Sequence, residues 1–157
     1  MIKKVIVECN PDEILVQVLG LNKKEIVHQD NKGEVCNYLE KYDVRVAIID
    51  EDPGSAQPNH LKKLKLVEEK FEIRKLIQAN SSKVILIIKP RLEEWIIYQC
   101  KKSGINPKEF LLPNNAKELK KVINLRLEYF RNLLKELFKK ENEGLKYLKK
   151  EINQAYK

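Results

Sequence analysis

The order of hydrophobic and polar positions predicts short buried strands along the first two thirds of the chain. Residues 3–7, 44–49 and 83–88 are short apolar runs rich in β-branched side chains, which is typical of such strands. Residues 25–28 form a weaker run and are expected to add a further short strand. The run at 83–88 is continuously apolar and favours a central place in a parallel sheet.

Helical spacing of apolar residues alternates with these runs. Asn10 precedes a proline and two acids, an arrangement that favours a helix start. The predicted helices span residues 10–19, 34–41, 60–79, 92–100 and, after Asn114 or Asn115, one long section that Gly144 interrupts or kinks. We therefore expect an α/β fold: a Rossmann-like, mostly parallel sheet of about four strands flanked by helices. Residues 1–112 would form this α/β domain, and residues 113–157 a basic helical extension packed on it.

Composition fits one globular domain. The chain has 157 residues, of which 43% are hydrophobic and 34% charged. The longest apolar run, residues 84–88, is too short for a membrane span, and residues 1–4 have no signal-peptide pattern. Cys9, Cys36 and Cys100 are too scattered to suggest disulfides or a zinc site. These features predict a cytoplasmic protein with reduced thiols and no membrane partner.

The net charge of +8 is uneven along the chain. Residues 113–157 hold 12 basic and 6 acidic residues and carry +6 of this charge. A basic segment favours attraction of DNA or RNA. A heat-adapted proteome, in which Lys and Glu are both abundant on surfaces, would give the same composition. Charge alone leaves these two interpretations open.

Three consecutive acids follow the strand at 44–49. Asp50, Glu51 and Asp52 repel one another, so folding alone gives little reason for their placement, whereas a bound cation gives one. The carboxyl ends of strands are the usual ligand site in open α/β sheets. The loop at 53–59 contains glycine and proline and is expected to be exposed beside these acids.

Glu8 ends the first strand and is the predicted partner of these acids. If the two strands are neighbours, Glu8, Asp50 and Asp52 meet at one sheet edge and can hold Mg²⁺, with Mn²⁺ as an alternative. Glu51 would point to the opposite side of the strand, and Asp12 could support Glu8 or a second metal. Acids at strand ends also act as caps and turn formers, which remains the simpler interpretation.

Two acidic motifs resemble those of the TOPRIM domain, which occurs in topoisomerases, primases, small nucleases and recombination proteins. Residues 7–13 read VECNPDE, similar to the TOPRIM strand that ends in Glu-Gly with a later acid, although Cys9 replaces the glycine. Residues 49–52 read IDED, similar to the Asp-x-Asp motif. The resemblance implies that Glu8 transfers protons and that Asp50 and Asp52 hold Mg²⁺. The implied function is a Mg²⁺-dependent nucleic-acid-binding protein, either a nuclease or a phosphodiester transferase.

A second resemblance leads to a different class of function. Asp50 followed by Pro53-Gly54, with Lys89-Pro90 after a later strand, resembles a response-regulator receiver. The alternative prediction is therefore a non-catalytic TOPRIM-like or receiver-like module that binds a protein or nucleic acid, alone or as a homo-oligomer. In either case Lys32, at a helix start, and Lys89, at a strand end, are candidate contacts for a substrate phosphate.

Overall fold

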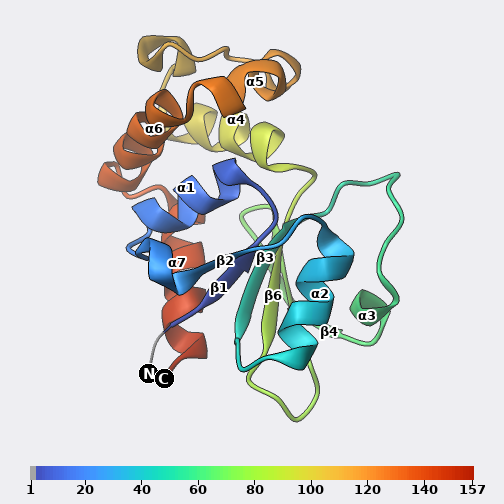
Figure 1. The fold of residues 1–157 in the computed structure, drawn as a ribbon. Coiled ribbons are helices and arrows are strands. Elements are labelled where there is room, and N and C mark those ends of the chain that lie inside the picture. The colour runs from blue at the N-terminus through green and yellow to red at the C-terminus, as the bar shows by residue number, and fades with distance from the viewer. Residues whose placement is uncertain (1–2) are drawn as a thin grey trace.

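The computed structural model describes residues 3–157 (Figure 1). Met1 and Ile2 lie outside the described residues. They belong to residues 1–4, for which the sequence shows no signal-peptide pattern. The strands are β1 (Val5–Val7), β2 (Ile26–His28), β3 (Val46–Asp50), β4 (Lys65–Lys70), β5 (Ile73–Ile77) and β6 (Val84–Ile88). The α-helices are α1 (Asn10–Val18), α2 (Lys32–Lys41), α3 (Asn59–Lys62), α4 (Leu92–Ser103), α5 (Ala116–Val122), α6 (Leu127–Lys139) and α7 (Glu143–Ala155). Short 3-10 helices lie at Lys23–Glu25, Pro107–Phe110 and Ile123–Leu125.

All six strands belong to one sheet, in the order β2-β1-β3-β6-β5-β4. The strands β2, β1, β3 and β6 are parallel, whereas β5 runs antiparallel to β6 and β4 antiparallel to β5. The prediction of an α/β fold with helices around the sheet is confirmed. The prediction of about four strands is wrong, because an antiparallel hairpin extends the four parallel strands and makes the sheet mixed.

Side chains alternate between two cores, one on each face of the sheet. Val5 and Val7 of β1 pack into a core shared with α1, α4, α5, α6 and α7, and Ile6 between them packs into a smaller core with α2. Helix α1 thus covers one face and α2 the other (Figure 1), and the strand order reverses between β1 and β3. In doubly wound sheets such a reversal is the place where ligands bind, at the carboxyl ends of the strands.

Residues 60–79 do not form the predicted long helix. Helix α3 ends at Lys62, and the β4–β5 hairpin follows. Leu61, Leu64, Val67, Phe71 and Leu76 keep helical spacing in the sequence, but the chain reverses direction at Phe71 and Glu72, so the spacing gave the wrong element. The hairpin turn consists of Phe71 and Glu72, whose φ angles are +54° and +58°. Asparagine and glycine usually mark such turns, and this turn contains neither.

Helix α4 holds that turn in place. The indole Nε1 of Trp95, which is 1% exposed, donates a hydrogen bond to the carbonyl oxygen of Phe71 at 2.8 Å. The backbone N–H of Lys89 donates to the carbonyl oxygen of Glu72 at 3.0 Å. These contacts offset the cost of left-handed backbone at two residues that have side chains.

The C-terminal section is three helices and not one helix altered at Gly144. The chain turns at residues 140–142, and the Asn142 side chain caps α7 by accepting a hydrogen bond from Leu145 N–H at 3.1 Å. Gly144 lies in the first turn of α7, where an added Cβ would lie 2.8 Å from the Trp95 ring. The glycine therefore permits close packing of α7 on α4 and does not mark a kink.

Tyr156, just after α7, ties the end of the chain to the beginning of the sheet. Its hydroxyl oxygen accepts hydrogen bonds from the backbone N–H groups of Lys4 and Arg45, each at 3.0 Å, and its O–H donates to the Lys4 carbonyl. The Arg45 guanidinium also donates to the Ala155 carbonyl at 3.1 Å. The segments leading into β1 and β3 are thus fixed by the last helix. None of the helices within residues 3–157 combines the length and apolar character that crossing a membrane requires.

Candidate functional site

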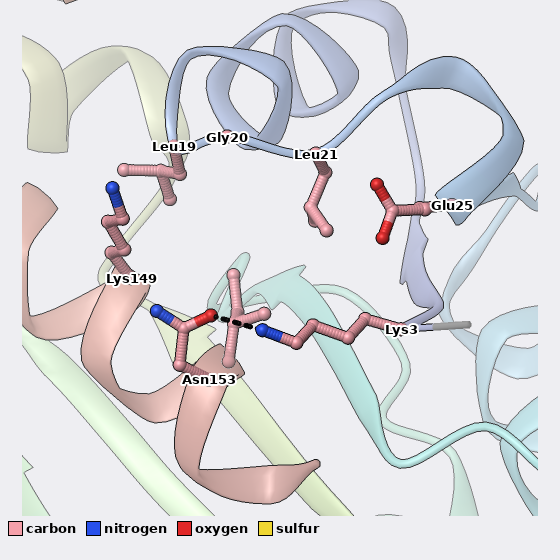
Figure 2. Close-up of a pocket in the computed structure, with 8 residues that line it drawn as sticks. Lys3, Leu19, Gly20, Leu21, Glu25, Lys149 and Asn153 are labelled. Carbon is pink, nitrogen blue, oxygen red and sulfur yellow. Dashed lines mark hydrogen bonds between the residues drawn. The ribbon is translucent and has the colours of Figure 1, made fainter. Parts of the chain in front are cut away.

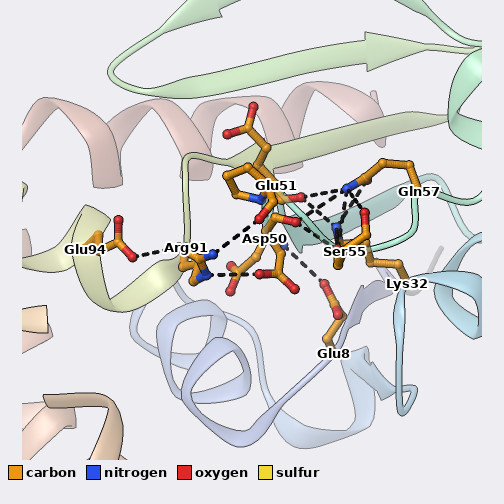
Figure 3. A network of polar contacts seen from close by, with 10 residues as sticks. Glu8, Lys32, Asp50, Glu51, Ser55, Gln57, Arg91 and Glu94 are labelled. Atoms are coloured by element: carbon orange, nitrogen blue, oxygen red, sulfur yellow. Dashed lines mark hydrogen bonds and ion pairs between the residues drawn. The ribbon is translucent and has the colours of Figure 1, made fainter. Parts of the chain in front are cut away.

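Glu8 and Asp50 meet where β1 and β3 end side by side. The Oε1 atom of Glu8 accepts a hydrogen bond from the backbone N–H of Asp50 at 3.2 Å (Figure 3). Asp12, in the first turn of α1, lies close enough to both side chains to raise the pKa of Asp50 and to be affected by Glu8. Three carboxylates from two strand ends and one helix start therefore gather at the point where the strand order reverses.

Two carboxylate oxygens in this cluster are buried without a hydrogen-bond partner among the described residues. They are Oδ1 of Asp12 and Oδ1 of Asp50. Asp12 as a whole is only 1% exposed. A buried carboxylate oxygen that accepts no hydrogen bond is costly, so each atom calls for a proton or a cation.

The Asp12 carboxyl is strongly perturbed. Burial raises its pKa from 3.8 to about 7, and the negative charges of Glu8 and Glu93 act in the same direction. A hydrogen bond from Cys9 opposes the shift. Burial and the Asp12 charge in turn raise the pKa of the Cys9 thiol far above its ordinary value, so Cys9 remains a neutral donor.

Asp50 is perturbed in the same way. Burial raises its pKa from 3.8 to about 8, the charge of Asp12 adds to the effect, and Glu8 and Glu93 contribute further. The backbone N–H of Leu92, at the start of α4, lowers it. The two aspartates thus disfavour each other's ionised form, and near neutral pH the cluster holds protons that a cation could replace.

Burial also raises the pKa of the Glu8 carboxyl. The hydrogen bond from the Asp50 backbone and the charge of Lys32 lower its pKa, and the charge of Asp52 raises it. Its position between two strand ends places it within reach of a group bound at Asp50. A carboxyl within reach of a bound substrate is a candidate for proton transfer.

Asp52 is directed away from this cluster and toward Arg91. Its backbone has φ +46°, and its Oδ1 lies 2.9 Å from Arg91 Nε. Arg91 Nη1 also lies 2.9 Å from Glu94 Oε1. A metal ion at Asp50 would gain Asp52 as a ligand only if this ion pair opened.

Lys32 is part of the internal structure. It is 7% exposed, and its Nζ donates to the Glu51 carbonyl oxygen at 2.6 Å and to Ser55 Oγ and Gln57 Oε1 at 3.2 Å each (Figure 3). These bonds order the loop that follows the acids. A phosphate could use this ammonium group only by displacing the loop, so the predicted phosphate contact stays a prediction.

Lys89 is paired with Glu69 of β4, a partner that comes from the hairpin. The pKa of Lys89 is raised by this hydrogen bond and the accompanying charge. Arg74 of β5, which lies opposite Glu69 in the hairpin, also forms an ion pair: its Nη1 lies 3.9 Å from Glu51 Oε2. The sequence pattern predicted a helix in place of the hairpin, so neither pairing was foreseen.

The residues fit a cation that takes few protein ligands. Within residues 3–157 no group of three or more His, Cys, Asp and Glu side chains is arranged to hold a metal ion. Mg²⁺ usually uses one or two carboxylates and fills its other positions with water and substrate phosphate. The unpartnered oxygens of Asp12 and Asp50 would supply the two carboxylate ligands, whereas Asp52 is taken up by its ion pair with Arg91.

Two cavities flank the acids. One, of about 550 Å³, lies on the α3 side and is lined by Asp50 and Glu51 together with aliphatic side chains such as Leu61 and Leu66. The other, of about 460 Å³, lies between the start of α4 and α5 and includes Asp52. Of the three clustered carboxylates, only Asp50 lines either cavity, on the α3 side.

A third cavity lies away from the acids, beside the C-terminal end of α1 and α7. It encloses about 290 Å³ and is lined by Lys3, Glu25 and Lys149, among others (Figure 2). Lys3 Nζ donates to Asn153 Oδ1 at 3.0 Å across it. Its charges are mixed, and none of the perturbed carboxyls lines it.

Comparison of the chain with protein-family models, curated proteins and solved structures gives no match. The TOPRIM resemblance thus rests on the two acidic motifs alone. Any functional conclusion has to come from the chemistry of the cluster itself.

Proposed function

We propose that the protein is a TOPRIM-like, divalent-cation-dependent protein that acts on nucleic-acid phosphodiesters. The observation that carries the proposal is the pair of buried, unpartnered oxygens on Asp12 and Asp50 at the reversal point of the sheet. Mg²⁺, with Mn²⁺ as a substitute, is the cation that suits two hard oxygen ligands beside an open cavity.

The chain's own residues would divide cation binding and proton transfer between them. Asp12 and Asp50 hold the cation, which when bound neutralises charge on a phosphate. Glu8, with its raised pKa and its hydrogen bond to the Asp50 backbone, is placed to move a proton to or from the substrate oxygen. The substrate would approach Asp50 through the cavity on the α3 side, which Asp50 lines.

A non-catalytic binding module is the alternative, and two observations favour it. Asp52, a metal ligand in the TOPRIM resemblance, is occupied by Arg91. Cys9 also fills the place of the family's glycine, where a side chain reduces access to the backbone. In this alternative the cation binds but no bond is cleaved.

Cation binding is tested first by thermal unfolding with Mg²⁺, Mn²⁺ or EDTA. A cation at a hundred times its Kd adds about 2.7 kcal/mol, which corresponds to roughly 5–10 °C in Tm for a chain of this size. Asp50→Asn and Asp12→Asn should abolish the increase. The exposed Asp43→Asn should retain it. An equal increase in all four proteins would contradict the proposed site.

Catalysis is tested on labelled single-stranded DNA, duplex DNA and RNA with Mg²⁺ or Mn²⁺. Cleavage by the wild type that is lost in Glu8→Gln and Asp50→Asn, and kept in Asp43→Asn, supports phosphodiester chemistry. Cation stabilisation without cleavage of any substrate supports the binding module.

A further inference from the structure

Three large apolar side chains around the start of α6 are exposed. Leu111 is 60% exposed, Leu125 is 85% exposed and Tyr129 is 42% exposed. Leu111 and Tyr129 line an open cavity of about 620 Å³, and the basic side chains of Lys108 and Arg126 line it with them. Leu125 directly precedes Arg126 in the chain. These five residues are called the α6 patch below, and apolar surface exposed in this way commonly marks an interaction site.

Leu111 has a backbone conformation that disfavours large side chains. Its φ is +60° and its ψ +33°, a left-handed conformation in which glycine avoids a steric cost that leucine bears. The Arg126 guanidinium donates a hydrogen bond to the Leu111 carbonyl oxygen at 2.9 Å and so holds this turn. The leucine side chain lies mostly in water, so little burial offsets the cost. Contact with another molecule would give the side chain the burial that the fold does not.

The α6 patch carries charge of one sign. Among residues 3–157, the charged side chains that line the cavity are Lys108 and Arg126, and no acid lines it. Neither cation forms an ion pair within the described part of the chain. Glu128, the first acid of α6, is paired with Arg131, whose Nε lies 3.4 Å from its Oε1. The patch therefore offers two cations beside apolar surface, and an acidic ligand with apolar side chains is complementary to it.

The composition of the α6 patch separates the classes of molecule that could cover it. A nucleic-acid strand fits less well, because strand binding of this kind depends on aromatic rings that stack on bases, and the patch has two leucines and one tyrosine. A second copy also fits less well. In a two-fold symmetric dimer the patch would meet itself, which brings four cations together. An acidic partner matches both the apolar surface and the charge.

We infer that the α6 patch binds an acidic amphipathic segment of a protein partner. The apolar side chains of the segment cover the two leucines and Tyr129, and its carboxylates pair with Lys108 and Arg126. Apolar and aromatic anchors with charged residues at the rim are the usual composition of protein interfaces. The inference is independent of the proposed function, because the carboxylates of the candidate site do not line this cavity.

The test is fluorescence anisotropy with three labelled synthetic peptides. The first has leucines on one helical face and glutamates on the other. The second has the same composition in scrambled order, and the third has lysines in place of the glutamates. We expect the first peptide to bind most tightly and its affinity to fall as the salt concentration rises.

Leu111→Gly separates docking from folding. Glycine adopts the left-handed backbone without strain, so the Tm should stay the same or rise, while binding of the acidic peptide should weaken about ten-fold. A leucine needed only for the fold would give a lower Tm instead. Lys108→Glu should weaken binding about ten-fold at low salt. Lys135→Glu, the same change at an exposed position on α6, should have far less effect.

A pair of tyrosines provides a second matched control. Tyr129 and Tyr98, on α4, are 42% and 43% exposed, and only Tyr129→Ala should weaken binding. Equal weakening in Tyr129→Ala and Tyr98→Ala, equal affinity for the three peptides, or no binding of the acidic peptide by the wild type overturns the inference. A dimer in light scattering that Leu111→Gly dissociates would assign the patch to a second copy. Displacement of the peptide by a single-stranded oligonucleotide whose own binding Leu111→Gly weakens would assign it to nucleic acid, and either result overturns the inference.

Discussion

The Nζ atom of Lys32 lies 2.6 Å from the carbonyl oxygen of Glu51, so a buried ammonium group from α2 fixes the backbone beside the candidate site. Its other acceptors, Ser55 and Gln57, belong to the same loop. The loop that borders the carboxylates is thus held from within the protein.

Replacing Lys32 by methionine keeps most of the side-chain volume and removes all three hydrogen bonds. We expect Lys32→Met to lower the free energy of unfolding by about 1–3 kcal/mol, because the Glu51 carbonyl loses its charged donor. Limited proteolysis should then cut within residues 53–58. The exposed Lys23→Met is the control, and equal stability of the two variants would show that the contact contributes little.

The raised pKa values of Asp12 and Asp50 predict a pH dependence of stability without metal. Both groups bind protons more tightly in the folded chain, so the free energy of unfolding should fall as pH rises from about 4 to about 8. Asp50→Asn should flatten this dependence because the amide cannot ionise. Urea unfolding in EDTA at both ends of the range measures it, and a rise in stability with pH would contradict the burial of these carboxyls.

Cation affinity should have the opposite pH dependence. A metal ion competes with the protons on Asp12 and Asp50, so Mg²⁺ or Mn²⁺ should bind more tightly at pH 8 than at pH 6 and release protons on binding. Calorimetry in buffers of different ionisation enthalpy counts those protons. A pH-independent affinity would place the cation elsewhere.

The hairpin turn offers a stabilising substitution. Glu72 is exposed and has φ +58°, a conformation that glycine adopts without steric cost. Glu72→Gly should therefore raise the free energy of unfolding by up to about 1 kcal/mol. Lys70→Gly, within β4, should lower it. Destabilisation by both changes would contradict the left-handed turn.

The parallel strands could be predicted because their sequences allow little else. Val84–Ile88 and the run before Asp50 are too short for buried helices and are rich in β-branched residues. The hairpin could not be predicted, since its turn of Phe71 and Glu72 lacks turn-forming residues and depends on a hydrogen bond from Trp95, distant in sequence.

The candidate site was likewise predicted only in part. Glu8 and Asp50 were expected to meet because adjacent parallel strands end at one edge, and they do. The pairing of Asp52 with Arg91 and the complete burial of Asp12 depend on how α4 and α1 pack over the strand ends. Local sequence carries no signal for either arrangement.

The contacts of Tyr156 bear on how the protein forms during synthesis. Its hydroxyl completes the hydrogen bonds of Lys4 and Arg45, which leave the ribosome more than a hundred residues earlier. The segments before β1 and β3 therefore remain incomplete until the last helix has emerged. Folding on the ribosome should therefore stop at an intermediate in which the chain entering β1 and β3 waits for α7 and Tyr156.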